Sequence, residues 1–266
     1  KRFRQSVLAA ACSGKLTADW RSQNYGANAR PLKDELIRRH HELTKNRLDE
    51  SKFAPKPEDV NLPNEWVWIN TGQVFHFVTS GSRGWAKYYS DSGATFLRVG
   101  NLDHDSIRLD LSSIQFVNAP DTAEAKRTRI SRGDFLISIT ADVGMTALVD
   151  IEFEAAFMNQ HVALARAVDG IDKEFLAYFL TSDAGGQVQS RNLPRGATKV
   201  GLGLDDIKNV WVPLPSLNDQ HEIVRRLEDL FTFDDQIVER YKKARSYTDT
   251  PNKSIPAKAF REHLVP

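Results

Sequence analysis

The sequence of 266 residues has only one cysteine, Cys12, and no apolar run that approaches the roughly 20 residues needed to cross a membrane. A single cysteine excludes an internal disulfide and a zinc site built from several cysteines, and it fits a reducing compartment. The basic start, residues 1–16, is too short and too charged for a secretory signal. We therefore expect a cytoplasmic protein without membrane contact and, because the chain begins at Lys1, a fragment of a longer one.

The chain also lacks a strong charge of either sign, since 36 basic and 35 acidic residues leave a net charge of +1. Residues 1–61 carry +5, residues 62–204 carry −3 and residues 205–266 carry −1. A protein that follows a nucleic-acid backbone normally has a basic face. If the central part binds a nucleic acid, its positive charge must be concentrated locally.

Catalytic and metal-binding patterns are missing as well. Residues 120–126 superficially resemble a nuclease pattern, but their acidic residues are nearly adjacent, whereas such a site takes them from separate strands. Residues 103–105 (DHD) and 40–42 (HHE) have no further ligand at a useful spacing. Residues 201–203 (GLG) lack the third glycine of a nucleotide-binding loop, and no Asn-Pro-Pro-Tyr motif of a methyltransferase occurs. We predict no catalytic residue, no bound metal and no cofactor on this chain.

Helical patterns dominate the first part of the chain. Residues 4–16 predict a short helix that stops at Ser13-Gly14, and Pro31 opens a second, mostly solvated helix over residues 32–52. The following stretch, residues 53–64, contains three prolines, which predicts an extended segment and a domain boundary.

The middle of the chain changes to short runs with strand composition, separated by glycines and Asp/Asn/Ser clusters. These runs are residues 66–70, 73–80, 95–102, 107–111, 114–117, 134–140, 146–151 and 161–168. Only residues 173–182 read as a clear helix among them. The pattern predicts an α+β domain with a mixed β-sheet and little regular βαβ alternation. Trp66 and Trp68 are better explained as core anchors than as base-stacking residues, and Gly133, Gly144 and Gly201 as residues of tight turns.

The last part predicts a strand over residues 209–215 and then a long helix, with Asn218 or Asp219 as its N-cap. An apolar stripe close to a heptad repeat follows the helix, and it consists of Ile223, Leu227, Leu230, Ile237 and Tyr241. The stripe either packs on its own domain or contacts a partner helix.

Two segments at the ends of the chain resemble each other. Residues 5–16 (QSVLAAACSGKL) and 253–264 (KSIPAKAFREHL) share Ser, Ala, Ala and Leu in register. Because the two copies bracket one complete domain, they predict a repeat that is longer than this chain.

An ordered series of motifs resembles the specificity subunits of type I restriction-modification systems, which serve bacterial defence. The series covers nearly the whole chain, and its order is more specific than any one motif. It consists of residues 62–75 (LPNEWVWINTGQVF), 95–102 (TFLRVGNL), 133–149 (GDFLISITADVGMTALV), 155–166 (AAFMNQHVALAR), 195–231 and the terminal repeats. Pro251 and Pro256 depart from the pattern, because the family usually continues its helix there.

The resemblance implies a mixed β-sheet target-recognition domain, residues 57–217, that binds double-stranded DNA. Conserved helical regions would flank it, residues 1–56 with the linker and residues 218–266, forming a coiled-coil-like arm that docks the modification subunit. S-adenosylmethionine, ATP and Mg²⁺ would belong to the modification and restriction subunits. Self-association through the C-terminal helix is a further expectation. The resemblance places Val7, Leu8, Ile223, Leu227, Leu230 and Ile237 on partner-helix contacts.

Three basic clusters are the predicted DNA contacts, although each could also be an ordinary solvated surface. The first combines charge with planar side chains and is expected to contact bases, while the other two are expected to contact phosphate. The first is Ser82, Arg83, Trp85, Lys87, Tyr88 and Tyr89; the second is Lys126, Arg127, Arg129 and Arg132; the third is Arg191, Arg195, Thr198 and Lys199. Arg98, within the predicted strand of residues 95–102, and Asn101 and Thr140, next to predicted strand ends, complete the set.

Two alternatives remain open. The chain could be the recognition domain of a fused restriction-methyltransferase enzyme, which a methyltransferase domain upstream in the parent gene would reveal. It could also be a coiled-coil interaction protein without a DNA role, although the β-rich domain with aromatic and arginine loops argues against this alternative.

Overall fold

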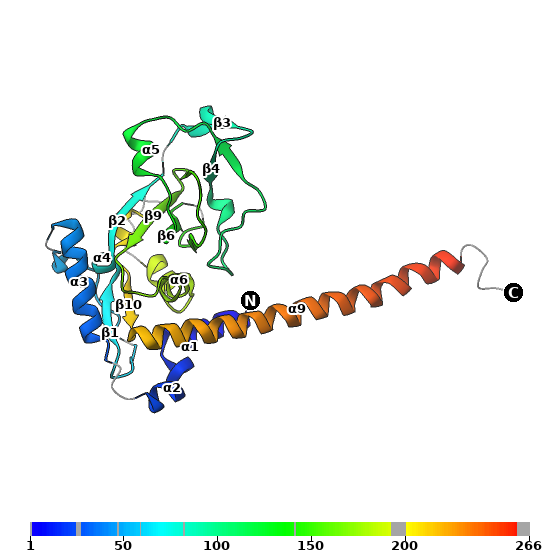
Figure 1. Ribbon diagram of the computed structural model, residues 1–266. Helices are drawn as coiled ribbons and strands as arrows, with labels where there is room; N and C mark the ends of the chain where they lie inside the picture. Colours follow the sequence, from blue (N-terminus) through cyan, green and yellow to red (C-terminus); the bar gives the residue numbers. More distant parts are fainter. Residues whose placement is uncertain are drawn as a thin grey trace. The chain divides into compact units, whose positions relative to one another are not determined.

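The computed structural model describes residues 2–24, 28–46, 48–58, 60–81, 83–140, 142–192 and 201–259, with the backbone alone at 192 and 248–259. The chain divides into two compact units, Lys1–Val224 and Arg225–Pro266. Unit 1 contains a two-stranded ribbon and two four-stranded sheets, together with several helices. Figure 1 shows β3 and α5 together at one end of unit 1, and β1 and β10 at the opposite end. The predicted α+β class is confirmed.

The central sheet has the strand order β2-β9-β6-β7, and all of its neighbouring strands are antiparallel. Every residue of β6 is buried, as are five of the six residues of β9, so these aliphatic runs lie between two covered faces. The four strands are β2 (Phe75–Ser80), β6 (Asp134–Ser138), β7 (Thr146–Leu148) and β9 (Val162–Ala167).

The second sheet has the order β3-β5-β4-β8, in which β4 and β8 run parallel. Its strands are β3 (Tyr89–Ser90), β4 (Ala94–Leu97), β5 (Gln115–Val117) and β8 (Ala156–Met158). The prediction of a strand over residues 107–111 was wrong. Ile107 is buried and its carbonyl oxygen accepts a hydrogen bond from Leu148 N, so its apolar side chain marks a packed loop.

The two-stranded ribbon joins the entry and the exit of the β-rich domain. β1 (Val67–Asn70) pairs antiparallel with β10 (Trp211–Leu214), with Val67 opposite Leu214. Asn70 then caps the short helix α4 (Thr71–Val74) by accepting from Gly72 N, and the Gln73 side chain accepts from Asn70 N in return.

The N-terminal segment is more helical than the sequence predicted. α1 (Arg2–Cys12) ends two residues before Gly14, whose φ of 75° lies in the left-handed region, which confirms the predicted stop at Ser13-Gly14. The polar stretch that follows contains α2 (Ala18–Gln23), which was not predicted. α3 (Arg30–Thr44) ends earlier than predicted because Lys45 adopts a left-handed φ of 58°.

Further helices interrupt the β-rich region, beyond the single one predicted. They are α4, given above, α5 (Ala123–Arg127), α7 (Gly186–Asn192) and α8 (Leu204–Ile207), in addition to α6 (Lys173–Thr181). α6 is the predicted helix; Asp172 caps it by accepting from Glu174 N and Phe175 N. Gly133, Gly144 and Gly201 all have positive φ, as the tight-turn prediction requires.

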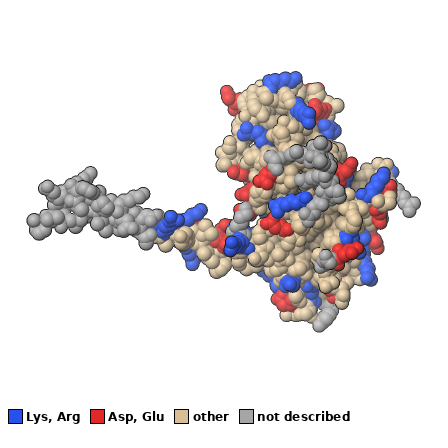
Figure 2. All heavy atoms as spheres, turned by 180° about the vertical axis from the view of Figure 1, so that it is seen from behind, with Lys and Arg blue, Asp and Glu red and all other residues tan. Residues whose placement is uncertain are grey.

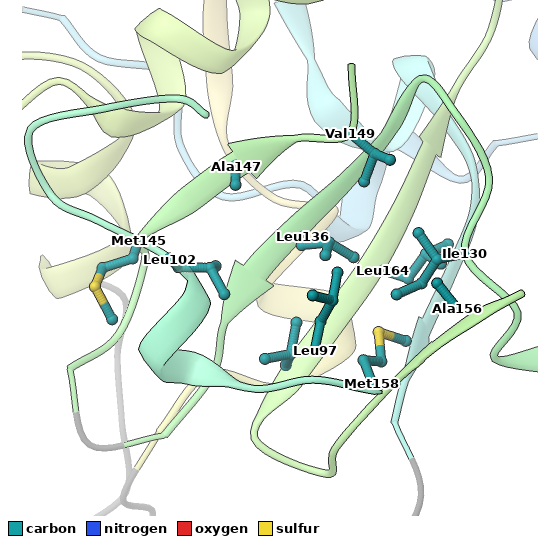
Figure 3. Close-up of a cluster of buried hydrophobic side chains, with 11 residues drawn as sticks. Leu97, Leu102, Ile130, Leu136, Met145, Ala147, Val149, Ala156, Met158 and Leu164 are labelled. Atoms are coloured by element: carbon teal, nitrogen blue, oxygen red, sulfur yellow. The ribbon is translucent and has the colours of Figure 1, made fainter. Parts of the chain in front are cut away.

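Two clusters of buried apolar side chains lie within the described part of the β-rich region. The larger one, shown in Figure 3, brings side chains of both four-stranded sheets together around Leu97, Leu136, Met158 and Leu164, which are each fully buried. The smaller one lies under β3 and α5 and contains Trp85, Phe96, Val117, Ala125 and Phe157.

The long helix predicted at the end of the chain is α9 (Leu217–Ala259), and it continues through Pro251 and Pro256. Its predicted N-cap was wrong. The helix already includes Asn218 and Asp219, and Ser216 precedes it, with the Ser216 hydroxyl accepting from Asp219 N. The side chain of Asp219 is therefore free for contacts inside unit 1.

Candidate functional site

The ends of several strands meet at one edge of unit 1. Ser80 pairs with Ala163, and Ser138 pairs with Val162, so the chain leaves β2 and β6 where it enters β9. Leu97 pairs with Met158 at the ends of the parallel strands β4 and β8. We call the segments that follow these ends the loop edge, defined by Gly81, Arg83, Arg98, Thr140, Asn159, Gln160, His161 and Gly201.

Backbone hydrogen bonds hold the loop edge together. Gly81 N donates to Val162 O, Ile139 N donates to His161 O, and Leu202 N donates to Ile139 O, at 3.0, 3.0 and 2.8 Å. A Cβ atom at Gly81 would lie 2.0 Å from the carbonyl oxygen of Asn159, so only glycine permits this approach. The position of the loop edge is therefore fixed by its backbone hydrogen bonds with the sheet.

Polar side chains gather at this edge. Thr140 Oγ1 lies 2.7 Å from His161 Nδ1, and Gln160 Nε2 lies 2.9 Å from His161 Nε2. All three residues are partly exposed. Sequence reasoning singled out Thr140 but missed His161 and Gln160, although both follow Asn159 in a motif that carried the family resemblance.

A second polar pair lies close by in the same region. His104 Nε2 and Asp142 Oδ2 are 2.5 Å apart, and the Asp142 carbonyl accepts from the Ser138 hydroxyl. Within the ranges described above, no group of three or more His, Cys, Asp or Glu side chains is arranged to hold a metal ion.

The first basic cluster surrounds the 3-10 turn of residues 85–88. Arg83 and Lys87 are exposed, and Lys87 Nζ lies 4.9 Å from the ring centre of Tyr88. Tyr89 is 43% exposed, so its ring is accessible. Trp85 differs, because it is 4% exposed and stacks on Phe96 with ring centres 5.4 Å apart. Trp85 therefore supports the loop from the core and is not available for a base contact. Ser82 lies outside the described residues.

Asn101 also has a supporting role. It is 3% exposed, its side-chain oxygen accepts from Arg98 N, and its amide nitrogen donates to the carbonyl oxygens of Asp110 and Ser113. Since its polar atoms are used inside the protein, the prediction of a groove contact by Asn101 was wrong in this structure. Hydrogen bonds from Ser112 lower the pKa of the nearby Asp110. Arg98 itself is partly exposed at the loop edge.

The second basic cluster is fully at the surface. Lys126 Nζ forms an ion pair with Asp121 at 2.8 Å, and Arg129 donates to the carbonyl oxygen of Glu154. Arg127 and Arg132 are exposed, and neither has an ion-pair partner among the described residues. Two positive charges of this cluster are thus open to an anion.

The third cluster is only partly described. Arg191 is exposed and forms an ion pair with Asp183 at 3.1 Å. Arg195, Thr198 and Lys199 lie outside the described residues. Figure 2 shows that basic and acidic side chains alternate on the face it presents, in keeping with the low net charge.

The predicted partner-helix residues divide by burial. Leu8, Ile223 and Leu227 are 4%, 0% and 1% exposed, so they pack inside this chain and cannot meet a partner without rearrangement. Val7 and Leu230 are partly exposed, while Ile237 is 50% exposed. Among the described side chains of α9 in unit 2, the exposed large apolar ones are Phe233, Ile237, Val238, Tyr241 and Tyr247, of which sequence reasoning missed Phe233, Val238 and Tyr247.

Among the described helices, none combines the length and the apolar composition needed to span a membrane.

Comparison with known proteins gives one consistent result. The family model described as "Type I restriction modification DNA specificity domain" matches residues 63–244. The specificity subunit of the type I restriction enzyme EcoBI from Escherichia coli is 29% identical over 273 aligned residues, which cover all of this chain and 50% of that protein. The chain thus spans about half the length of the curated relatives it matches.

Two solved structures have the same fold. One, described as "Structural basis underlying complex assembly and conformational transition of the type I R-M system", has a TM-score of 0.57 and 25% identity, covering 89% of this chain and 55% of that one. The other, the HsdS subunit from Thermoanaerobacter tengcongensis, has a TM-score of 0.52 and 21% identity, covering 99% and 58%. The latter similarity concerns the fold alone.

Proposed function

The chain belongs to the family of type I restriction-modification DNA specificity domains, and we propose that it reads one half of a bipartite target in double-stranded DNA. It acts as the recognition component and performs no catalysis itself. A modification subunit methylates the DNA and a restriction subunit cuts it, so S-adenosylmethionine, ATP and Mg²⁺ belong to those partners. The complex works in the cytoplasm.

One observation carries the proposal most directly. Arg83, Arg98 and Thr140, which are far apart in the sequence, follow the ends of β2, β4 and β6, and these strand ends lie together at the loop edge. Residues that read bases must be held within a narrow geometry, and strand ends of a packed sheet provide this. Arg83 and Tyr89 are proposed to contact bases, and Arg127 and Arg132 to contact phosphates.

The proposal assigns DNA binding and subunit docking to different parts of the chain. Residues 57–217 are proposed to bind DNA, while residues 1–56 and 218–266 serve as the spacer and the docking surface for the modification subunit. The exposed apolar side chains of α9, Phe233, Ile237, Val238 and Tyr241, support the docking role. The same surface could mediate self-association, which is a second outcome of a docking experiment.

The proposal can be tested by fluorescence anisotropy with a randomised duplex pool, with and without the modification subunit, over a series of salt concentrations. We expect binding that weakens with salt and that narrows to one short half-site when the modification subunit is present. Arg127→Ala and Arg132→Ala should each reduce the salt slope by about one unit and weaken all sequences alike. Arg83→Ala should instead relax one base position. A folded chain that binds no duplex in either condition would contradict the proposal and favour a helical interaction protein.

A further inference from the structure

The hydroxyl group of Thr140 is held in one place at the loop edge. Thr140 follows β6, and its Oγ1 lies 2.7 Å from Nδ1 of His161. The backbone is fixed on both sides of this contact, because Ile139 N donates to His161 O and Ile139 O accepts from Leu202 N. The backbone N–H of His161 also donates to the side-chain oxygen of Asn159 at 3.1 Å. The relative position of the two side chains is thus set by three chain segments.

The neighbouring amide determines the direction of the hydrogen bond between them. Gln160 Nε2 lies 2.9 Å from Nε2 of His161, and an amide nitrogen can only donate. His161 Nε2 is therefore the acceptor, and in a neutral imidazole the proton then resides on Nδ1. His161 Nδ1–H donates to Thr140 Oγ1. The Thr140 O–H can therefore donate to a partner other than His161 or Gln160.

This arrangement makes Thr140 a hydrogen-bond donor toward whatever covers the loop edge. A hydroxyl group that already accepts one hydrogen bond becomes a stronger donor. If it faced another donor in a closed interface, its own O–H would remain unpaired, which is unfavourable. Thr140 is partly exposed, so the hydroxyl can be reached. The residue is therefore suited to a group that offers only lone pairs.

We infer that Thr140 distinguishes bases in the major groove by donating to guanine O6 or N7 or to thymine O4, and that it rejects cytosine. Cytosine presents an amino donor in that groove, whereas guanine and thymine present acceptors. His161 and Gln160 are positioning residues that set the direction of the Thr140 hydroxyl. The inference rests on the proposed DNA recognition and names the chemical class of base read at this point of the site.

Substitutions at His161 give the sharpest test. In His161→Asp, the carboxylate must accept from the Thr140 hydroxyl, so Thr140 presents only lone pairs to the DNA, and the preference should shift toward cytosine. In His161→Asn, the amide N–H can still donate to Thr140, so the original preference should be retained. Asp and Asn have nearly the same shape, so they isolate the direction of the hydrogen bond. The added negative charge weakens all sequences alike, and the ratio of Kd values at one position therefore remains the readout.

Substitutions of Thr140 locate the position that is read. The chain, with its modification subunit, is first used to select a half-site from a random duplex pool. Duplexes that differ at one position are then compared by anisotropy. We expect a preference of about tenfold for guanine or thymine over cytosine at one position, loss of this ratio in Thr140→Val and its recovery in Thr140→Ser.

The possible results separate the inference from the proposed function. An unchanged ratio at every position in Thr140→Val would overturn the base-reading role of Thr140. The same preference in His161→Asp as in the unmodified chain would overturn the role of His161. If the folded, unmodified chain binds no duplex at all, the proposed function itself fails. Arg132→Ala serves as the matched control, because losing a phosphate contact should weaken every duplex equally and leave the ratio intact.

Discussion

The indole Nε1 of Trp66 donates a hydrogen bond of 2.8 Å to Oδ2 of Asp219, although 153 residues separate them in the sequence. Asp219 is 1% exposed, and its other oxygen accepts from the Thr17 hydroxyl at 2.6 Å. Arg21 completes the group with an ion pair of 3.3 Å to Asp219. One carboxylate thus joins the N-terminal helices, the first strand of the β-rich domain and the start of α9 within unit 1.

Asp219→Ala is expected to destabilise the fold by roughly 3 kcal/mol, because it leaves the Trp66 N–H and the Thr17 O–H without an acceptor and the charge of Arg21 poorly compensated. Urea unfolding followed by circular dichroism measures this change. Asp229→Ala is the control, because Asp229 is 68% exposed in its ion pair with Arg225 and should contribute less than about 1 kcal/mol. Equal losses in the two variants would contradict a joining role for Asp219.

The importance of Asp219 also shows where sequence reasoning fell short. Its position near the start of an amphipathic pattern suggested an N-cap, but Ser216 takes that place, because its hydroxyl accepts from Asp219 N. Local spacing predicts which residues share a helix or a strand, and most of the predicted strands and both long helical segments are found in the structure. Contacts such as those from Trp66 and Thr17 depend on how distant segments pack, and no local pattern contains that information.

The candidate site has the same limit. The arginines and Thr140 were predicted as candidates because basic clusters and strand ends are visible in the sequence. Trp85 was misplaced, because an aromatic residue directly after a glycine looks like a loop residue, yet a 3-10 turn directs its ring onto Phe96. His161 was missed because its partner Thr140 is 21 residues away and meets it only when β6 and β9 pair.

Acidification is expected to destabilise unit 1 through two histidines. Burial lowers the pKa of His40 and of His76 below the ordinary value of 6.5. The folded state then binds protons less readily than the unfolded state, so the stability that each contributes is present above pH 6.5. It is lost as the pH falls from there through the folded-state pKa. Urea unfolding should therefore give a smaller free energy of unfolding at pH 5.5 than at pH 7.5.

His40→Gln is the informative variant for this dependence. His40 is 5% exposed and Nδ1 has no hydrogen-bond partner among the described residues, while a ring N–H donates to the backbone of Phe75. Glutamine can keep a donor there but does not titrate. The decrease in the free energy of unfolding between pH 7.5 and 5.5 should therefore be smaller in this variant, and His76 should account for the decrease that is left. A loss as large as that of the unmodified chain would assign the dependence to other groups.

Cys12 is expected to be unreactive in the folded protein. Burial raises the pKa of its thiol to about 11, so only about one molecule in a thousand carries the reactive thiolate at pH 8. A thiol-specific chromogenic reagent should therefore react slowly, and the rate should rise sharply in urea at the concentration where the chain unfolds. Cys12 is partly exposed, so rapid reaction of the folded chain would show that its sulfur is not shielded from water as the raised pKa requires.

Substitutions of Trp85 and Tyr89 should show which of the two residues supports the fold and which contacts DNA. Trp85→Ala removes a ring that contacts Phe96 and Phe157, so it should destabilise the fold by about 3–5 kcal/mol. Tyr89→Ala removes a ring that is 43% exposed, so it should change stability far less and lower DNA affinity directly. Thermal unfolding and anisotropy on the same preparations distinguish the two roles. Normal stability in Trp85→Ala would mean that this residue is free to contact DNA.

Gly81 and Gly84 lie on one loop but should respond differently to alanine. In Gly81→Ala the new Cβ would approach the carbonyl oxygens of Asn159 and Met158 to 2.0 and 2.4 Å, so the backbone must move. We expect a loss of about 3 kcal/mol and a displaced loop edge with weaker DNA binding. In Gly84→Ala the Cβ meets no atom within 4 Å, so only the left-handed φ of 74° costs free energy, about 1 kcal/mol.

The comparison tests whether the loop edge must be held by the sheet to bind DNA. Gly84→Ala strains the loop but leaves the contact of Gly81 with Val162 intact, whereas Gly81→Ala disturbs the contact that places Asn159 beside β2. Unfolding in urea and anisotropy at low salt should therefore rank Gly81→Ala well below Gly84→Ala in both stability and affinity. If the two variants bound DNA equally well, the position of Gly81 would matter for folding alone, and DNA contacts would have to be sought around the 3-10 turn of residues 85–88 instead.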